Sequence, residues 1–293
     1  MTCLTGANGF LGQSISHQIY LEGVISLGRS SSDIRCDLCS QIPNLPTVEI
    51  VIHAAGKAHS VPKTVVEKKE FFDVNVKGTE NLLKGLEQAP ALPKSFVFIS
   101  SVSVYGMERG TNIDETHPVE AKDPYGLSKI QAEKIVADWC AKHDVICGIL
   151  RLPLLVGANP PGNLGTMIKG IKKGYYFNIA GGEARKSMVM AEDVAKIIPR
   201  LSEVGGVYNL TDGYHPSFIE LSKHIANQFG KKYVPNMPKP LAASLAKIGD
   251  VIPQFPLNSS KLNKITSDLT FNDDKARAYL GWSPKRVLDA FII

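Results

Sequence analysis

A glycine-rich turn at the start of the chain limits what the sequence can fold into. In "TGANGFLG" (5–12), Gly6, Gly9 and Gly12 separate a short apolar run from the helical pattern that follows. Glycine permits a tight turn and lets the backbone approach a phosphate, while the N-terminus of the next helix faces the negative charge. At a first strand–helix junction this spacing predicts a dinucleotide-binding fold. The alternative is a turn with a purely structural role.

Apolar runs and helical periods alternate over the first half of the chain. Buried strands rich in β-branched residues, separated by helices, indicate a parallel sheet covered on both faces. The helix that begins at Pro124 is expected to bury Ile130, Ile135, Val136 and Trp139. Strands are expected at residues 1–5, 24–28, 48–56, 95–101 and 145–153, and the other helices at 9–22 and about 64–88.

The pattern changes after residue 153, where "GANPPGN" interrupts the chain. Shorter elements follow at "KSMVM" (186–190) and "VYNLTDG" (207–213), and Ser217 with Glu220 forms a capping box for a helix that extends to Phe229. We therefore expect an α/β protein in which residues 1–156 form a Rossmann-type, doubly wound parallel sheet. Residues 157–293 would form a smaller α/β substrate lobe, with some elements returning to the first domain.

Composition and charge argue against several classes of protein. Lys and Arg exceed Asp and Glu by 33 − 28 = +5 without a basic block, so nucleic-acid binding is not expected. No apolar run approaches the roughly 18 residues of a membrane span, and the strand-like start leaves no room for a signal peptide. We expect a cytoplasmic protein without a membrane partner. The five cysteines fit a reducing compartment, and the Cys36-x-x-Cys39 motif has no second ligand pair, so no metal is expected.

Three motifs in order carry a resemblance to a known family. They are "TGANGFLG", "SSVSVYG" (100–106) and "YGLSK" (125–129), accompanied by "HAAG" (53–56), "NVKGT" (75–79) and "YLGW" (279–282). The chain resembles the extended short-chain dehydrogenase/reductase family, which comprises NAD(P)-dependent nucleotide-sugar epimerases, dehydratases and reductases. The resemblance covers residue 1 to about residue 285. Looser matches favour the branch of bacterial UDP-sugar 4-epimerases and 4-keto reductases.

Tyr125 and Lys129 stand four residues apart and therefore share one face of a helix. In isolation such a pair is better read as a half-buried ring and a solvated charge. A tyrosine can exchange a proton with a sugar hydroxyl, but its ordinary pKa near 10 makes it a weak base, and a nearby cation with the nicotinamide ring would lower that pKa. The resemblance implies that Tyr125 is the acid/base, that Lys129 tunes it and holds the nicotinamide ribose, and that Ser101 orients the reacting oxygen. Tyr105 would pack beside the site.

The end of the second strand bears on the choice of dinucleotide. Gly28 stands where an NAD site carries Asp or Glu, and Arg29 follows, either to bind a 2′-phosphate or merely to be solvated. Together they favour NADP(H), with NAD(H) as the other possibility. The dinucleotide contacts implied by the resemblance, with Asp37 and Leu38 at the adenine, are Gly6, Asn8, Gly9, Phe10, Leu11, Gly12, Arg29, Asp37, Leu38, Ala54, Ala55, Gly56, Asn75, Ser100, Tyr125, Lys129 and Pro153.

The resemblance also implies the reaction and the assembly. Val102 and Ser103 stand where the 4,6-dehydratases carry an Asp-Glu pair, so dehydration is disfavoured. We expect NADP(H)-dependent reduction of a 4-keto nucleotide sugar, which the resemblance to this branch implies to be UDP-linked; NAD-dependent C4 epimerisation and a nonenzymatic NADP-binding sensor are the alternatives. Helices at 64–88 and 124–142 imply a homodimer with a four-helix interface. Implied substrate contacts are Ser101, Ser103, Asn163, Leu164 and Arg185, with Lys186 at the place of the usual diphosphate-binding arginine.

Overall fold

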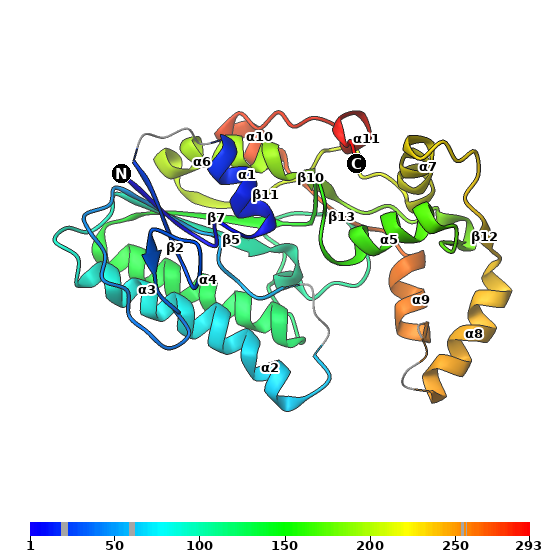
Figure 1. Ribbon diagram of the computed structural model, residues 1–293. Coiled ribbons are helices and arrows are strands. Elements are labelled where there is room, and N and C mark those ends of the chain that lie inside the picture. The colour runs from blue at the N-terminus through cyan, green and yellow to red at the C-terminus, as the bar shows by residue number, and fades with distance from the viewer. Residues whose placement is uncertain (19–22, 59–61, 253–254, 256) are drawn as a thin grey trace.

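The computed structural model has a seven-stranded, fully parallel sheet at its centre (Figure 1). It describes residues 1–18, 23–58, 62–252, 255 and 257–293. The inner strands are buried along most of their length because both faces are covered, as their apolar runs predict. In spatial order the strands are β11 (Gly206–Asn209), β7 (Ile146–Leu152), β5 (Ser95–Ser101), β4 (Ile50–His53), β1 (Thr2–Thr5), β2 (Val24–Gly28) and β3 (Ile34–Arg35).

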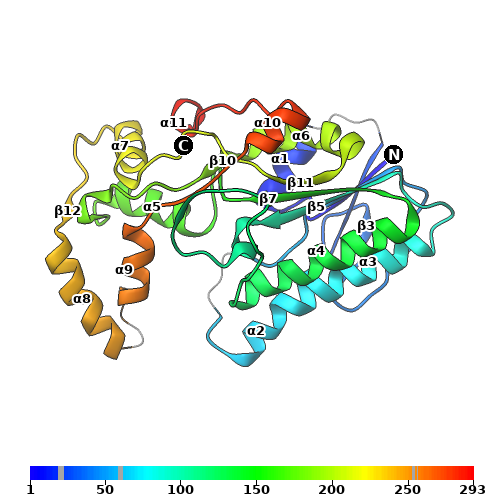
Figure 2. The same ribbon diagram turned by 180° about the vertical axis from the view of Figure 1, so that it is seen from behind.

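Helices cover both faces of this sheet, so the predicted doubly wound α/β fold is confirmed (Figures 1 and 2). One face is covered by α1 (Phe10–Gln18), α6 (Ala191–Val204) and α10 (Asp274–Leu280). The opposite face is covered by α3 (Gly78–Glu87) and α4 (Pro124–His143), which α2 (Val65–Phe72) precedes along the chain. Each face has its own apolar core. The carboxyl ends of β1, β4 and β5 therefore meet at one edge.

Several element boundaries differ from the sequence predictions for local reasons. The expected helix over 64–88 contains a π-helical turn at Asp73–Lys77 between α2 and α3. The strand expected at 48–56 ends at His53, because the backbone after it passes against the glycine turn. Ile130 and Ile135 are only half-buried on α4, whereas Val136 and Trp139 are buried as predicted. Residues 19–22 of the first expected helix lie outside the described residues.

The rest of the chain builds a second, smaller group of elements beside the sheet. One apolar core joins α5 (Gly162–Lys173), α7 (Phe218–Gln228), α11 (Val287–Ala290) and the pair β8 (Leu154–Val156) with β10 (Met188–Met190). The capping box of Ser217 and Glu220 is present at α7. Two further parallel pairs join β6 (Gly110–Ile113) to β13 (Leu269–Phe271) and β9 (Asn178–Ile179) to β12 (Asn236–Met237). Finally, α8 (Lys239–Val251) and α9 (Ser259–Thr266) project from the body (Figure 1).

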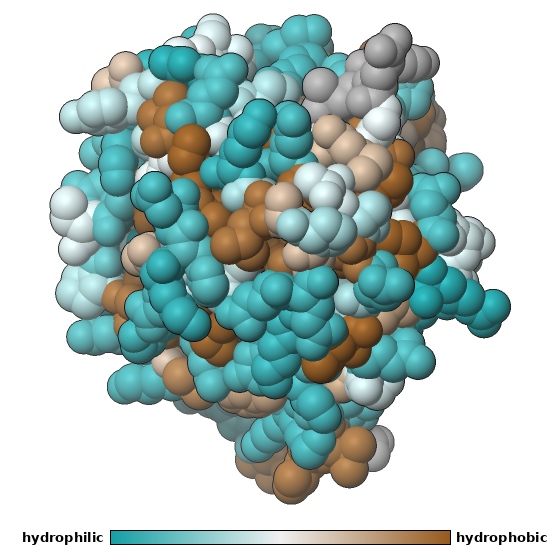
Figure 3. Space-filling model, turned by 90° about the vertical axis from the view of Figure 1, so that its left-hand side faces the viewer, coloured by the Kyte–Doolittle hydropathy of each residue, from teal (hydrophilic) through white to brown (hydrophobic). Residues whose placement is uncertain are grey.

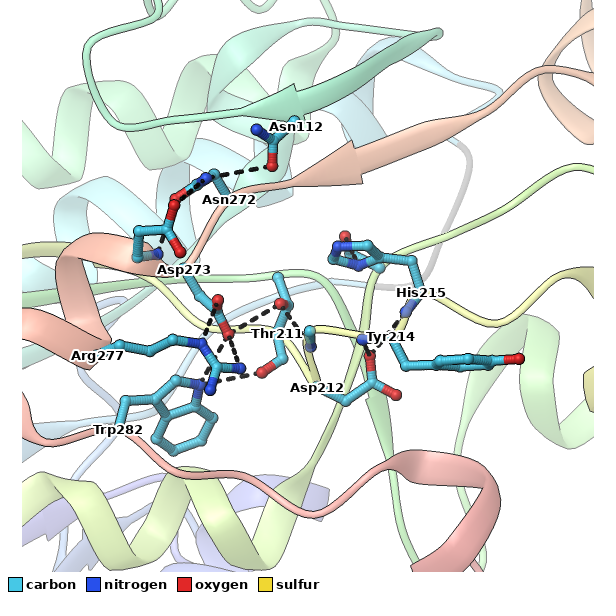
Figure 4. A network of polar contacts seen from close by, with 12 residues as sticks. Asn112, Thr211, Asp212, Tyr214, His215, Asn272, Asp273, Arg277 and Trp282 are labelled. Atoms are coloured by element: carbon cyan, nitrogen blue, oxygen red, sulfur yellow. Dashed lines mark hydrogen bonds and ion pairs between the residues drawn. The ribbon is translucent and has the colours of Figure 1, made fainter.

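A polar network joins the C-terminal segment, from Asp273 to Trp282, to Thr211, which follows β11 (Figure 4). The Asp273 carboxylate accepts hydrogen bonds from the Arg277 guanidinium (2.9 Å), the Thr211 hydroxyl (3.1 Å) and the Trp282 indole N–H (3.1 Å). The indole N–H also donates to the Thr211 carbonyl at 3.0 Å. The "YLGW" motif thus serves to anchor the end of the chain.

None of the helices in the described part of the chain combines the length and the apolarity that crossing a bilayer needs. On α4, one of the helices expected to pair in a dimer, few apolar side chains are exposed. On α4 the exposed positions include Gln131, Lys134 and Asp138, with Leu127 as an exposed apolar residue. The homodimer stays a prediction.

Candidate active site

A cavity of about 1170 Å³ lies at the carboxyl ends of the central strands, between the sheet and the second group of elements. Residues from β5, α1, α4, α5 and β13 all reach it, so it can contact both a dinucleotide and a second ligand. Thirteen of the predicted site residues line it: Gly9, Phe10, Leu11, Gly12, Ala54, Gly56, Ser100, Ser101, Ser103, Tyr125, Lys129, Pro153 and Asn163.

The glycine turn is closed so tightly that side chains are excluded. A Cβ on Gly12 would lie 2.0 Å from the Gly6 carbonyl oxygen, and one on Gly6 would lie 2.6 Å from the Ala55 backbone nitrogen. Gly6 also has a φ of +72°, in the left-handed region that favours glycine. The turn that leads into α1 therefore has no side chains at Gly6, Gly9 and Gly12, which fits a pyrophosphate at the helix N-terminus.

Tyr125 is placed by the start of α4. The Asp123 side chain caps the helix by accepting hydrogen bonds from the backbone N–H groups of Tyr125 and Gly126, both at 3.1 Å, and Pro124 occupies the first turn. The Tyr125 ring packs 5.9 Å from the Phe71 ring, centroid to centroid. Burial raises the pKa of the Tyr125 phenol, while its hydrogen bond with the Ser101 hydroxyl lowers that pKa and the charge of Asp123 raises it.

Lys129 lies one turn further along α4 and is buried. Its Nζ donates to the Ile99 carbonyl at 2.8 Å and lies 4.7 Å from the centre of the Phe98 ring. Burial lowers the pKa of Lys129 to about 8, against the opposing effect of the Glu133 carboxylate. The predicted lowering of the Tyr125 pKa is not found among the protein's own groups, because burial of the phenol outweighs its hydrogen bond with Ser101.

Glu133 continues this column one turn beyond Lys129 and was not predicted as part of the site. Its carboxylate accepts from Arg151 at 2.8 Å and from the Ser100 hydroxyl at 2.5 Å, and both partners of this ion pair are buried. Arg151 also donates to the Tyr105 hydroxyl at 3.1 Å. The signal in the sequence is the four-residue spacing from Tyr125 through Lys129 to Glu133.

The comparisons with known proteins agree with this geometry. The model of the "NAD dependent epimerase/dehydratase family" matches residues 2–210, which is most of the chain. The chain belongs to this family. It is accordingly an NAD(P)-dependent enzyme of the epimerase/dehydratase type, and the family predicted from the three motifs is confirmed.

Relatives of this epimerase/dehydratase-family enzyme are named for different substrates and ligands. It is 26% identical to N-acetyl-alpha-D-glucosaminyl-diphospho-ditrans,octacis-undecaprenol 4-epimerase of Escherichia coli O157:H7, over 94% of this chain and 88% of the relative. The UDP-glucose 4-epimerase of Thermotoga maritima, solved with UDP-glucose, has a TM-score of 0.74 at 20% identity, covering 97% and 94% of the two chains. RMD from Pseudomonas aeruginosa, complexed with NADPH, has a TM-score of 0.70 at 20% identity, covering 98% and 94%. The two solved structures share the fold.

Asn75, from the "NVKGT" motif, holds Lys57 and Ser128 in place beside the active site. Its side-chain oxygen accepts from the Lys57 backbone N–H at 2.7 Å, and its side-chain nitrogen donates to the Lys57 carbonyl at 3.1 Å and to the Ser128 hydroxyl at 2.9 Å. Asn75 lies in the π-helical turn, and such turns are frequent at functional sites. Asn75 thereby ties the loop after β4 to α4.

The side chain of Lys186, rather than that of Arg185, faces the cavity. Arg185 is turned away, since its guanidinium donates to the His215 carbonyl at 3.1 Å and lies 3.7 Å from the Glu220 carboxylate. Leu164 is likewise buried in the core of the second group, although its neighbour Asn163 lines the cavity. The residues that sequence reasoning missed in the lining include Lys57, Ser187, Phe218, Lys264 and Phe271.

The remaining predicted dinucleotide contacts lie beyond the lining of this cavity. Asn8 donates from its side chain to the Ser30 carbonyl at 2.9 Å, which joins the glycine turn to the end of β2. Leu38 is buried and accepts at its carbonyl from Asn81 at 2.7 Å, while the Asp37 carboxylate accepts from the Cys39 N–H at 3.1 Å. The adenine contact of Asp37 and Leu38 stays a prediction.

Proposed function

We propose that this enzyme uses NADPH to reduce the 4-keto group of a sugar carried on a diphosphate. The observation that supports this proposal most is the set of residues at the end of β2. Gly28 is followed by Arg29, which is exposed, and Arg35 donates from its Nε to the Arg29 carbonyl at 3.2 Å. The carboxylate of the same loop, Asp33, accepts from the backbone and hydroxyl of Ser26 at 2.8 and 2.7 Å. This end of the strand offers two cations to a 2′-phosphate.

The protonation state of Tyr125 suits reduction. Because burial raises its pKa, the phenol keeps its proton at neutral pH and can donate it to a carbonyl oxygen. When bound, the nicotinamide would supply the hydride to the carbonyl carbon. Tyr125 would supply the proton to the oxygen, which becomes the new hydroxyl, and Ser101 would hold that oxygen by hydrogen bonding.

Lys129 would bind the dinucleotide, and its positive charge lies near the Glu133 carboxylate. One of its N–H groups is committed to the Ile99 carbonyl, which leaves two donors for ribose hydroxyls. The buried pair of Glu133 and Arg151 lies behind it, and the Glu133 carboxylate favours the charged form of the lysine. These groups support the role that the family resemblance implies for Lys129.

Lys186 is the strongest candidate for holding the diphosphate of the substrate. Its Nζ donates to the carbonyls of Lys264 and Ser267, both at 2.9 Å, so it is held in place by neutral groups. Of the other cavity lysines, Lys57 is paired with Glu70 and Lys264 with Glu108, and Lys129 is placed at the dinucleotide. The names of two relatives, a UDP-glucose epimerase and a diphospho-undecaprenol-linked sugar epimerase, support a diphosphate-linked sugar.

The second candidate is C4 epimerisation with a retained dinucleotide, which the printed names of several relatives favour. The two reactions differ in their use of cofactor. A reductase should oxidise one NADPH for each UDP-4-keto sugar consumed, whereas an epimerase should interconvert UDP-glucose and UDP-galactose without net oxidation. We expect stoichiometric NADPH oxidation with the keto sugar. Epimerisation without NADPH consumption would reject the reductase proposal and select the alternative.

Arg29→Ala should remove most of a preference for NADPH over NADH. An arginine–phosphate hydrogen bond contributes about 1.5–3 kcal/mol net, which corresponds to about ten- to a hundredfold in affinity. Titrating both nucleotides into the wild type and the variant measures the effect. Arg200→Ala, which removes another exposed arginine at the far end of α6, should leave both affinities unchanged.

Gly28→Asp should go further and reverse the preference, because a carboxylate repels the 2′-phosphate and accepts from the ribose hydroxyls. A Cβ at Gly28 would lie 2.8 Å from the Ser32 Oγ, so this change is best combined with Ser32→Ala. Equal affinities of the wild type for NADPH and NADH would contradict the cofactor assignment.

A further inference from the structure

The helices α8 and α9 form a projecting two-helix unit, called here the arm, whose core contains small residues (Figures 1 and 2). On α8 the buried positions are Ala242, Ala246 and Gly249. A Cβ on Gly249 would lie 1.8 Å from the Leu257 carbonyl oxygen, so the chain leading into α9 lies directly against the helix there. Of the larger apolar side chains of α8, Leu245 is half-buried against this core, whereas Leu241 and Ile248 are exposed.

Apolar side chains form a ridge along α8 that is exposed at most of its positions. Leu241, Leu245 and Ile248 lie along one face of the helix, and Ile252, the residue that ends α8, follows at the same spacing. Leu241 is 52% exposed, Ile248 45%, Ile252 50% and the neighbouring Val251 80%, whereas Leu245 is half-buried against the core of the arm. Exposed apolar patches of this kind can mark an interaction site.

The arm carries much of the net positive charge of the protein. Residues 239–266, from the start of α8 to the end of α9, contain four lysines and one acidic residue, Asp250, which gives 4 − 1 = +3, and one of these lysines, Lys264, is paired with Glu108. The net charge of the whole chain is +5, so the other residues together contribute +2. Lys239 and Lys247 are exposed on α8 itself. The arm is therefore an apolar ridge set in a basic surrounding.

A second apolar tip lies on the same side of the molecule. The first residues of α2, Val65 and Val66, are 81% and 68% exposed, with Lys63 and Lys68 beside them. The start of α2 and the far end of the arm both point downward in Figures 1 and 2. Figure 3 shows hydrophobic residues gathered at this lower end of the molecule.

The cavity reaches toward both projections. Its lining includes Lys57 and Ala58, which precede α2 along the chain, and Lys264 and Ile265, which belong to α9. A flat surface that touched both projections would therefore lie beside the active site.

We propose that the α8 ridge and the tip of α2 dock on the surface of an anionic lipid bilayer. A basic amphipathic helix buries its apolar face at the boundary of headgroups and acyl chains while its lysines lie among anionic headgroups. A second copy of the chain is a poorer occupant, because two arms of +3 each would repel one another. Docking in this way would present the active-site cavity to substrates at the membrane surface.

Flotation of the full-length protein with phosphatidylcholine vesicles, with and without phosphatidylglycerol, tests the proposal. We expect binding only to the anionic vesicles, weakening as salt is raised. Ile248→Ser combined with Ile252→Ser should lower the vesicle-bound to free ratio by about tenfold or more. Lys239→Gln and Lys247→Gln should each lower it by about fivefold. A matched control, Ile42→Ser combined with Ile292→Ser, removes two exposed isoleucines outside the arm and should bind like the wild type.

Three outcomes would overturn the proposal. The first is equal binding of the wild type and the ridge variant, and the second is equal binding to neutral and anionic vesicles. The third is an oligomer, seen by sedimentation without lipid, that the ridge substitutions dissociate, because the occupant of the ridge would then be a second copy. The ridge residues touch neither Tyr125 nor the glycine turn, so NADPH oxidation in detergent-free solution serves as a check that each variant is folded.

Discussion

Replacing Tyr125 by Phe is expected to lower kcat of the NADPH-dependent reaction by about 10²–10⁴, the contribution typical of a general acid. The substitution removes one oxygen and leaves the ring packed 5.9 Å from that of Phe71. Dinucleotide affinity should stay within a fewfold of the wild type, because the glycine turn and Lys129 are untouched. Steady-state kinetics and fluorescence titration of NADPH separate the two quantities.

Tyr105→Phe is the matched control, because it removes the same oxygen from a buried tyrosine a short distance away. The Tyr105 hydroxyl donates to the Asn209 side chain at 2.8 Å and accepts from Arg151, and in the described part of the chain Tyr105 does not line the cavity. This variant should lose about 1–3 kcal/mol of stability, because a buried arginine donor loses its partner, while kcat changes little. A loss of only a fewfold in kcat for Tyr125→Phe would disprove the acid/base role.

The fold was predictable because its sheet is fully covered. A strand with both faces buried is rich in apolar residues, and β5 keeps that pattern over Phe96–Ile99. The glycine turn was equally readable, since the Gly6 and Gly12 positions have no room for a side chain. Both signals are local, so the sequence contains them in full.

Features that depend on contacts between distant segments could not be predicted in this way. The side chain that enters the cavity at residues 185–186 is decided by the pairing of this segment with Ser217 and Leu269, which turns Arg185 outward and Lys186 inward. The π-helical turn follows from Asn75 reaching the Lys57 backbone, 18 residues away in sequence. Periodicity within one helix carries neither piece of information.

The electrostatics of the site needed the structure for the same reason. Spacing on a helix correctly placed Lys129 one turn from Tyr125, but it could not show that the Lys129 Nζ is held by the Ile99 carbonyl or that burial dominates the pKa of the phenol. The Glu133–Arg151 pair joins α4 to β7, and its partners lie 18 residues apart. A buried ion pair can be recognised only when the exposure of both side chains is known, and composition does not give this exposure.

His53, the first residue of the "HAAG" motif, should make the protein lose stability in mild acid. Its ring is buried at the end of β4, with Nδ1 2.6 Å from the Thr5 hydroxyl and Nε2 2.9 Å from the Thr79 hydroxyl. The Thr79 hydroxyl donates its own proton to the Asn75 carbonyl at 2.7 Å, so it accepts from Nε2–H, and Nδ1 accepts from Thr5. The hydrogen bonds are therefore complete with a neutral imidazole.

The pKa of His53 is lowered to about 3, first by burial and then by the charge of Lys129. An unfolded histidine has a pKa near 6.5, so between about pH 6.5 and pH 3 the unfolded chain binds a proton that the folded protein does not. The stability that depends on neutral His53 is present above about pH 6.5 and is lost as the pH falls toward 3. The slope is at most about 1.4 kcal/mol per pH unit, and the total about 5 kcal/mol.

Urea unfolding at a series of pH values measures this loss in the wild type, in His53→Gln and in His17→Gln. Glutamine at position 53 lowers stability at neutral pH but removes the titrating group, so the slope of unfolding free energy against pH should become shallower below about pH 6.5. His17 is exposed near the end of α1, and its replacement should leave the slope of the wild type unchanged. If the His53 and His17 variants showed the same slope, acid would be acting elsewhere. The network that joins β1 and β4 to Asn75, and through Asn75 to the active-site loop, would then not depend on the charge state of His53.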